Sequence, residues 1–506
     1  MIISSEVQKS AVEAPKENAG GRAQPPVALE SVGRGIVVLS ASNGIALLLG
    51  GLTTIIAGRI LIPEAFGRLA TANLVVAWLN TITGTVFLPG LRKIVSEDHD
   101  RMSAAIRFGA RWHTLASLAL GCIFCLLSAP AAWAFGDSQL TMLFLLCGLQ
   151  VPLAGLVNLA ATLFAGIRRF WWSSMLKAAD GALGGVGAVA FLLVWSSATA
   201  MFWGLLLGTA GSAALAVAMM MKEYPRWRLI TYAPMWNRLW YWTSVSLPGA
   251  IVLGTLLTVD MWLVKGILGN SAAPGLYAAA YALSRFPMFM VYGLGLAVFT
   301  RVSHEFHHQE FALARLVSVE ALRISIMFLL PICTITIVSS SELLTFLFSS
   351  TYAGAAPALS VMMAAMVLFG LLETGLRLVS ATDRPGAGLV ILSVLLAAAV
   401  AVNLILIPRF GIMGAAWGSV LVFGVGAIAA LALVFRYLGA LPPLLSFVRC
   451  GIGSGIAFAL GASWHADGSM VLIKLSGLSF AYLAALVLSR ELRREDLRRI
   501  RKSIWP

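Results

Sequence analysis

The 506-residue chain is 59% hydrophobic and only 11% charged, and its mean hydropathy is +0.89. A soluble domain carries roughly 25% charged residues, so these side chains are too few to cover a water-facing surface. Lipid is therefore the expected solvent for most of the chain. The net charge of +14 is spread over short loops between apolar runs rather than over one continuous face, which argues against nucleic-acid binding.

The chain divides by composition into two tails and a long apolar region. Residues 1–32 are polar, mixed in charge and rich in Ala, Pro and Glu. This composition predicts a disordered cytoplasmic tail, and no pattern of a cleaved signal peptide is present. We expect an all-α polytopic membrane protein with the following parts: an N-lobe of six helices at 33–235, a C-lobe of six helices at 236–440, two appended helices at 441–489 and a basic cytoplasmic tail at 490–506.

The number of membrane spans comes from the apolar runs. A helix of about 20 apolar residues crosses the hydrocarbon core of a bilayer. Fourteen runs qualify, and each is expected to form one transmembrane helix. They begin near Gly35, Leu69, Thr114, Leu140, Ser173, Ala198, Trp242, Leu276, Ile324, Ala355, Gly388, Ile412, Phe447 and Met470.

The loop charges test this count, because Lys and Arg accumulate in cytoplasmic loops. With the N-terminus inside, most of the 36 basic residues fall in the two tails or in loops that follow even-numbered helices. Those expected outside are few: Arg59, Arg68, Lys265, Arg409 and Lys474. An error of one helix would scramble this alternation. The pattern therefore predicts an even number of helices with both termini in the cytoplasm.

Four stretches then carry a resemblance to a known family. They are RILIPEAFGRLA from Arg59, GLYAAAYALSRFPMFMVYGLGLAVFTRVSHEF from Gly275, LLTFLFSSTYAGAAPALSVM from Leu343 and LIPRFGIMGAAWGSVLV from Leu406. In this order, and with this number of helices, the chain resembles the oligosaccharide and polysaccharide flippases. These belong to the multidrug/oligosaccharidyl-lipid/polysaccharide exporter superfamily. The resemblance covers roughly residues 30–440.

The resemblance implies a function in lipopolysaccharide or exopolysaccharide biosynthesis. It implies two six-helix lobes around a central cavity, which carry an undecaprenyl-diphosphate-linked glycan across a bacterial inner membrane by alternating access. Expected partners are the lipid-linked glycan, membrane lipid, and a glycan polymerase with its export machinery. No cofactor or metal is expected. Alternatives within the superfamily are a cation-coupled drug exporter and a flippase for the peptidoglycan precursor.

Charged residues inside the apolar runs are the candidate site residues, because a charge near the bilayer centre costs about 2.5–3.5 kcal/mol. Arg285 is the strongest, since it precedes Pro287, and its planar guanidinium suits a phosphate. We expect it to contact the diphosphate or an acidic sugar. A salt bridge to Asp260 or Glu373 that only joins helices is the alternative. Arg377 is a further candidate contact.

The remaining candidates have structural alternatives of their own. Arg59 and Arg68 flank the outer turn at Pro63, either as interfacial anchors or as contacts that release the anionic headgroup. The candidates for coupling transport to a cation are Asp260, Glu373, Asp180 and Lys177. Lys177 and Asp180 are three residues apart on one helix, so they could instead neutralise each other.

Other functional classes are disfavoured by absent patterns. The sequence has no phosphate-binding GxxxxGK[ST] loop and no apparent catalytic triad. The histidines at 304, 307 and 308 lack the HExxH spacing, and the five cysteines lie in or beside apolar runs. A glycan polymerase or glycosyltransferase would need a large outer loop or acidic clusters, and neither is present. The first apolar run has no acidic residue, which argues against the drug exporter.

Overall fold

The computed structural model describes residues 32–97, 102–227, 236–269, 271–382 and 384–491. Every regular element within these ranges is a helix. The predicted N-terminal tail up to residue 31, and the C-terminal tail from residue 492 on, lie outside the described residues.

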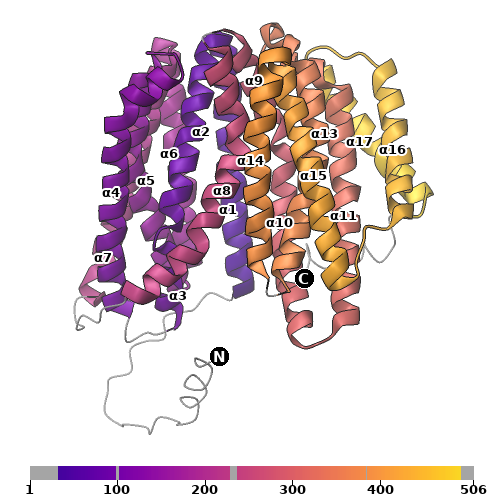
Figure 1. The fold of residues 1–506 in the computed structure, drawn as a ribbon. Coiled ribbons are helices and arrows are strands. Elements are labelled where there is room, and N and C mark those ends of the chain that lie inside the picture. The colour runs from indigo at the N-terminus through magenta and orange to yellow at the C-terminus, as the bar shows by residue number, and fades with distance from the viewer. Residues whose placement is uncertain (1–31, 98–101, 228–235, 270, 383, 492–506) are drawn as a thin grey trace.

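The N-lobe is the part of the chain from α1 to α7 (Figure 1). Its helices are α1 Val32–Ile60, α2 Pro63–Thr85, α3 Leu88–Glu97, α4 Met102–Ala134, α5 Leu140–Gly166, α6 Phe170–Trp195 and α7 Ala198–Trp227. α4 packs on α5, and α6 packs on both α7 and α1. Pro63 opens α2, a position where a missing N–H needs no partner.

The C-lobe runs from α8 to α15, and a hairpin of α16 and α17 is appended to it. The helices of the C-lobe are α8 Trp236–Leu268, α9 Ala273–Ser284, α10 Phe286–His307, α11 Phe311–Val338, α12 Ser340–Leu347, the 3-10 helix η1 Ser350–Ala355, α13 Ala356–Ser380, α14 Pro385–Phe410 and α15 Ile412–Leu438. The hairpin consists of α16 Leu444–Ser463 and α17 Met470–Leu488. It packs on the C-lobe through α11.

The prediction of an all-helical polytopic membrane protein is confirmed. Among the described residues, twelve helices are long and apolar enough to cross a membrane. The other two of the fourteen predicted spans fall on α1 and on the pair α9–α10. The eighth predicted span is therefore not one continuous helix, because it breaks at Arg285 between α9 and α10.

Two further elements were not expected from the sequence. α3 lies where a loop was predicted, and it is amphipathic: Leu91, Ile94 and Val95 are buried while Arg92 and Lys93 are exposed. The segment around Tyr352 forms the short pair α12 and η1. Both elements are too short to span a bilayer, so a search for long apolar runs does not detect them.

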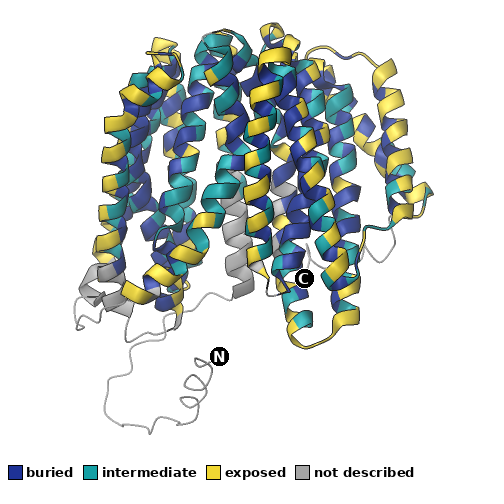
Figure 2. Ribbon diagram, in the orientation of Figure 1, coloured by how far each residue is buried: buried dark blue, intermediate teal, exposed yellow. Residues whose placement is uncertain are grey.

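The outer faces of the bundle are apolar. Figure 2 shows exposed residues along the outward sides of α4, α14 and α16, with buried residues between the helices. Large apolar side chains among the exposed ones include Leu126, Val425 and Leu488, which are 80%, 62% and 84% exposed. Exposed apolar surface on this scale is expected where the neighbouring phase is lipid.

The appended hairpin is fastened to the C-lobe near both of its ends. Near the α16–α17 turn, the Lys474 ammonium pairs with the Glu342 carboxylate of α12 at 2.7 Å. Just after α17, the Glu491 carboxylate pairs with Arg323 of α11 at 2.6 Å and with Arg449 of α16 at 3.2 Å. The hydrogen bonds from Ser446, Arg323 and Arg449 outweigh burial and lower the pKa of Glu491.

Candidate functional site

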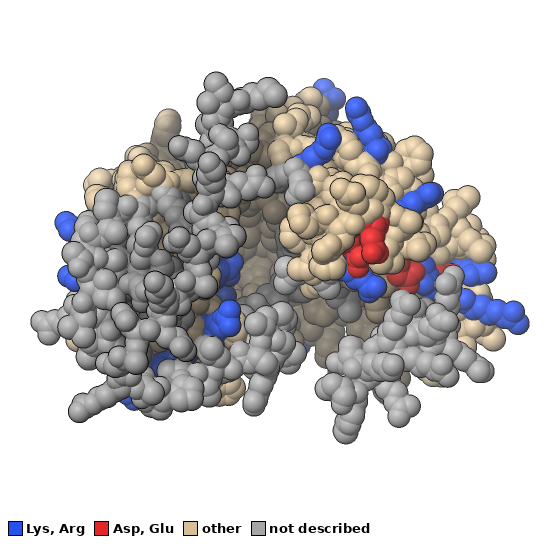
Figure 3. Space-filling model, turned by 90° about the horizontal axis from the view of Figure 1, so that it is seen from below, with Lys and Arg blue, Asp and Glu red and all other residues tan. Residues whose placement is uncertain are grey.

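A cavity of about 1550 Å³ lies between the two lobes. Below, the upper end means the end where α1 passes into α2, and the lower end the one where α1 begins (Figure 1). The cavity extends from Phe66 and Phe348 near the upper end to Asn80 towards the lower end of α2. Residues of α1, α2, α5, α6 and α7 line one side, and residues of α8–α12 and α17 line the other. Seen from below, the surface is hollowed between the lobes (Figure 3).

The lining is mostly apolar and contains two charged residues among those the structure describes. Asp180 of α6 belongs to the N-lobe, and Arg285 belongs to the C-lobe. The other six candidates predicted from the sequence, Arg59, Arg68, Arg377, Asp260, Glu373 and Lys177, are not among the lining residues. The cavity therefore presents one acidic and one basic side chain on different lobes.

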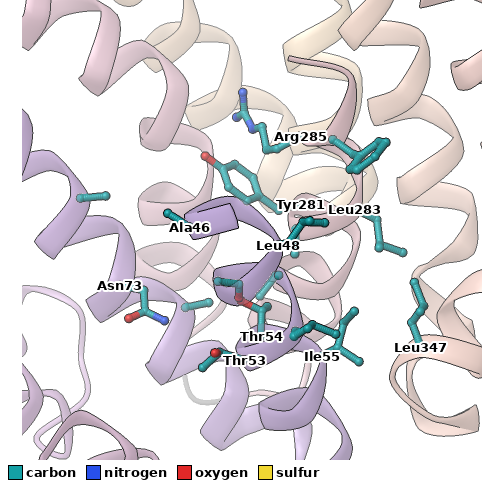
Figure 4. Close-up of a pocket in the computed structure, with 18 of the residues that line it drawn as sticks. Ala46, Leu48, Thr53, Thr54, Ile55, Asn73, Tyr281, Leu283, Arg285 and Leu347 are labelled. Atoms are coloured by element: carbon teal, nitrogen blue, oxygen red, sulfur yellow. The ribbon is translucent and has the colours of Figure 1, made fainter. Parts of the chain in front are cut away.

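Arg285 is positioned by the break in the helix. It lies at the end of α9 and just before α10. Pro287, in the first turn of α10, has no backbone N–H and cannot continue the helical hydrogen bonds of α9. Twelve residues of α9 place Arg285 about 18 Å below the upper start of that helix, near the middle of a bilayer. Its guanidinium stacks 4.2 Å from the centre of the Tyr281 ring, and the two side chains lie together in Figure 4.

Two polar partners of Arg285 lie on α8. Its Nη2 donates to the Leu257 carbonyl oxygen at 2.7 Å and lies 3.8 Å from Asp260 Oδ2. That carboxylate oxygen also accepts a hydrogen bond of 2.8 Å from the Tyr277 hydroxyl. The predicted salt bridge to Asp260 is therefore present but long, and Arg285 still reaches the cavity. Arg285 thus lies on the cavity wall and also pairs with Asp260, and its contact with a diphosphate stays a prediction.

Asp180 and Lys177 do not neutralise each other. Among the described residues no ion pair joins them, although they are three positions apart on α6. The Asp180 carboxylate instead lies near Ser212 of α7, whose hydroxyl donates to the Gly208 carbonyl oxygen at 3.1 Å, and Asp180 Oδ1 has no hydrogen-bond partner.

Glu373 and Arg377 form a pair within α13, with 2.5 Å between Oε1 and Nη2. This i,i+4 pair lies at the lower part of α13, and Arg377 packs over Gly295 of α10. The predicted bridge between Glu373 and Arg285 is absent in the described structure. Glu373 and Arg377 are both absent from the cavity wall in this conformation.

Arg59 and Arg68 lie where the lobes meet at the upper end. Arg59 donates from Nε to the Leu347 carbonyl oxygen at 2.9 Å and also to the Phe346 carbonyl oxygen, which joins α1 to α12. Arg68 donates from Nε to Asp137 Oδ2 at 2.8 Å. Both arginines therefore make protein contacts rather than acting only as interfacial anchors.

Asp137, in the turn between α4 and α5, was not selected from the sequence. Its Oδ2 also accepts a hydrogen bond from Lys265 of α8 at 2.8 Å, so that it links the lobes. Burial disfavours the carboxylate, but the hydrogen bonds from Lys265 and Arg68 more than offset it and lower the pKa of Asp137. The residue lies outside the apolar runs, and only the fold brings it to Lys265.

Aromatic and glycine contacts complete the upper closure. Phe66 of α2 packs against Phe348 and Tyr352 of the C-lobe, with ring centres 5.7 Å apart in both pairs. Gly67 and Gly275 lie back to back: a Cβ on Gly67 would come 2.8 Å from the backbone nitrogen of Gly275. The lobes are thus joined above the cavity. At the lower end α8 of the C-lobe also contacts the N-lobe, where the Phe87 backbone N–H donates to the Thr243 hydroxyl oxygen at 3.1 Å.

Several solved structures have a fold similar to that of this chain. The chain is similar to a structure of the lipid II flippase MurJ in an inward closed conformation, with 15% identity and a TM-score of 0.73 over 90% of this chain and 100% of that one. It is also similar to an inward-facing multidrug resistance MATE family transporter of the MOP superfamily, with 14% identity and a TM-score of 0.64 over 79% and 98%.

A third similar structure is a MOP superfamily transporter from Pyrococcus furiosus, with 15% identity and a TM-score of 0.57 over 80% of this chain and 95% of that one. These identities are low, so the structures establish the shared fold. No curated protein matches the chain.

The sequence itself matches one family model over residues 56–357, which is more than half of the chain. This segment begins in α1 and ends in α13, so it includes Arg285 and the cavity wall formed by α2, α5, α6 and α7. The chain is a multi-pass membrane protein that belongs to the polysaccharide biosynthesis protein family.

Proposed function

We propose that this protein is a flippase that moves an undecaprenyl-diphosphate-linked oligosaccharide, the repeat unit of a polysaccharide, across the membrane by alternating access. The observation that carries the proposal is Arg285, which lies at a helix break near mid-membrane and lines the cavity between the lobes. The family match and the MurJ-like fold support the same class of cargo.

The chemistry of Arg285 suits a diphosphate. A guanidinium stays ionised at any cellular pH and offers planar, paired donors that match phosphate oxygens. The nearest described carboxylate, that of Asp260, lies 3.8 Å from Nη2, and a phosphate in the cavity would add charge-assisted hydrogen bonds to the guanidinium. Stacking on the ring of Tyr281 holds the guanidinium at the cavity wall.

The orientation of the protein in the membrane follows from the loop charges. We infer that the lower end faces the cytoplasm of a bacterium and that both termini lie there. Arg92, Arg168, Lys222 and Arg301 lie at lower helix ends, which is the arrangement of the positive-inside rule. The upper contacts then close the cavity towards the periplasm, and the hollow between the lobes lies on the cytoplasmic side.

Coupling to a cation is a further proposal, and it concerns the buried acids. Asp180 is the strongest candidate, because it lines the cavity and one of its carboxylate oxygens lacks a partner. Asp260 is the next, since it lies behind Arg285 and would respond to phosphate binding there. Glu373 and Lys177 lie off the cavity wall, where a coupling role would require another conformation.

Deletion of the gene, with Arg285→Ala and Arg285→Lys complementation, tests the function. We expect loss of surface glycan, accumulation of undecaprenyl-linked repeat units on the cytoplasmic face, rescue by the wild type and no rescue by Arg285→Ala at normal protein level. Arg285→Lys should rescue partly, because it keeps the charge without the planar fork. The exposed Arg409→Ala is the matched control, with full rescue expected.

Two other outcomes would redirect the assignment. Normal glycan together with new sensitivity to cationic drugs would point to a drug exporter. Accumulation of the peptidoglycan precursor instead of a polysaccharide unit would point to a flippase for that precursor. Normal export by Arg285→Ala would remove Arg285 from the mechanism. We regard an enzymatic role, such as glycan polymerisation, as the least supported, because the fold is that of transporters.

A further inference from the structure

We propose that the N-lobe wall of the cavity contains a site that accepts hydrogen bonds from sugar hydroxyl groups, built on Gln150, Asn80 and Asp180. The inference rests on the proposed function, and it assigns different walls to the two parts of the cargo. The diphosphate binds Arg285 on the C-lobe, and the first sugar binds the N-lobe. All three acceptor residues line the cavity.

Gln150 of α5 gives the clearest evidence. It is only 5% exposed, and its Nε2 donates to the Thr209 hydroxyl oxygen at 3.2 Å. That hydroxyl uses its own proton on the Leu205 carbonyl oxygen at 3.0 Å, so it can only accept from Gln150. The amide orientation is therefore fixed, and Oε1 is the atom left without a partner. A buried carbonyl oxygen held in this way needs a hydrogen-bond donor, which a ligand in the cavity can supply.

Asp180 adjoins the same face of α7. Its carboxylate lies near Ser212, which is one turn after Thr209 and whose hydroxyl donates to the Gly208 carbonyl oxygen at 3.1 Å. Asp180 Oδ1 has no partner. Asn80 of α2 adds a third such atom, because its Oδ1 is also buried without a partner. α2 and α7 both pack on α5, and α6 packs on α5 and α7, so the three residues belong to one contiguous wall.

The three unpartnered oxygens of the wall are acceptors, and they favour a ligand that donates hydrogen bonds. A phosphate has no hydrogen to donate at neutral pH and would be repelled by Asp180. A sugar presents several hydroxyl donors, and each can serve one of these oxygens. Asn73 and Thr53 lie on the same side of the cavity and extend the polar surface (Figure 4). A single carboxylate among neutral oxygens is a weak site for a divalent cation, and no group of three metal-ligating side chains occurs among the described residues.

Binding measurements with two lipids test the site. The full-length protein in nanodiscs is titrated with undecaprenyl diphosphate and with undecaprenyl diphosphate carrying one glucose. We expect Gln150→Leu and Asn80→Leu each to raise the Kd of the glucosylated lipid about tenfold and to leave that of undecaprenyl diphosphate unchanged. Arg285→Gln should weaken both lipids. Thr336→Val is the control, because its hydroxyl lines the cavity but already donates to the Ile332 carbonyl oxygen at 2.8 Å.

The results separate this site from the proposed function. Equal loss of affinity for both lipids, or no loss for either, in both Leu variants would overturn the sugar site while leaving the flippase standing. If the two Leu variants change only the sodium dependence of binding, the sugar site would be overturned in favour of a cation site. A wild type that binds neither lipid would contradict the proposed function and this inference with it. If Gln150→Leu fails to fold, Asn80→Leu alone decides, because it lies on a different helix.

Discussion

The carboxylate of Asp137 and the ammonium group of Lys265, 128 positions apart in the chain, lie 2.8 Å from each other, with both side chains 2% exposed. Asp137 belongs to the N-lobe and Lys265 to the C-lobe, so their contact exists only while the upper ends of the lobes are together. Arg68 shares the same carboxylate oxygen. The cluster is therefore specific to the conformation described.

Removing the carboxylate should open the upper end. Asp137→Asn leaves Lys265 and Arg68 as like charges facing a neutral amide, and losing one partner of a buried pair costs about 3–5 kcal/mol. We expect a shift in population towards the open upper end. Electron-spin distance measurements between labels at Ser138 and Ser271, in a cysteine-free background, would show a second, longer distance. An unchanged distance distribution would mean that other contacts alone hold the closure.

The contact between the upper ends of the lobes should also be insensitive to pH over the physiological range. Asp137 has its pKa lowered from an ordinary value of 3.8 in the closed state, so its contribution is complete above that value. It is lost only as the pH falls through the lowered pKa. The label distance should be constant from pH 8 to pH 5. A transition within that range would assign the closure to another titrating group.

A methyl group at Gly67 should also hold the lobes apart. Its Cβ would lie 2.8 Å from the Gly275 nitrogen and 3.2 Å from the Pro274 side chain, too close for the closed contact. Gly67→Ala is expected to lengthen the same label distance. Gly84→Ala on the same helix is the control, because its Cβ would meet open space. The interpretation fails if both variants behave alike.

The two acidic partners of Arg323 should differ sharply in their contribution to stability. The side chain of Glu491 is 2% exposed and that of Glu320 is 31% exposed. Glu491→Gln leaves Arg323 buried beside a neutral group, for an expected loss of about 3 kcal/mol. Glu320→Gln removes a surface pair and should cost under about 1 kcal/mol. Denaturant unfolding in detergent, followed by tryptophan fluorescence, measures both, and equal losses would contradict the assignment.

The sequence predicted those parts of the fold that depend on local composition. Apolar runs and loop charges located the helices because lipid imposes length and sign on each segment separately. The break at Arg285 had a local signal in Pro287, yet the span was expected to be continuous. Helix α3 was missed because its apolar face is too short for a membrane run and is buried only by neighbouring helices.

The residues of the candidate site also differ in whether local sequence could predict them. Arg285 and Asp180 could be found from the sequence because each is a charge within an apolar run. Asp137 and Gln150 could not. One is in a turn and the other is uncharged, and their importance comes from partners on distant helices, Lys265 and Thr209. A contact between segments far apart in the chain leaves no spacing that a single sequence shows.

Fastening α16 and α17 to the C-lobe has a hydrodynamic consequence. The ion pairs of Glu342 with Lys474 and of Glu491 with Arg323 make the hairpin part of the C-lobe body, which thereby presents a larger cross-section to the lipid than the N-lobe. Viscous drag in the membrane rises with that cross-section. In a rocking motion the N-lobe should therefore sweep the larger angle, while the C-lobe, with Arg285, stays nearly still in the bilayer.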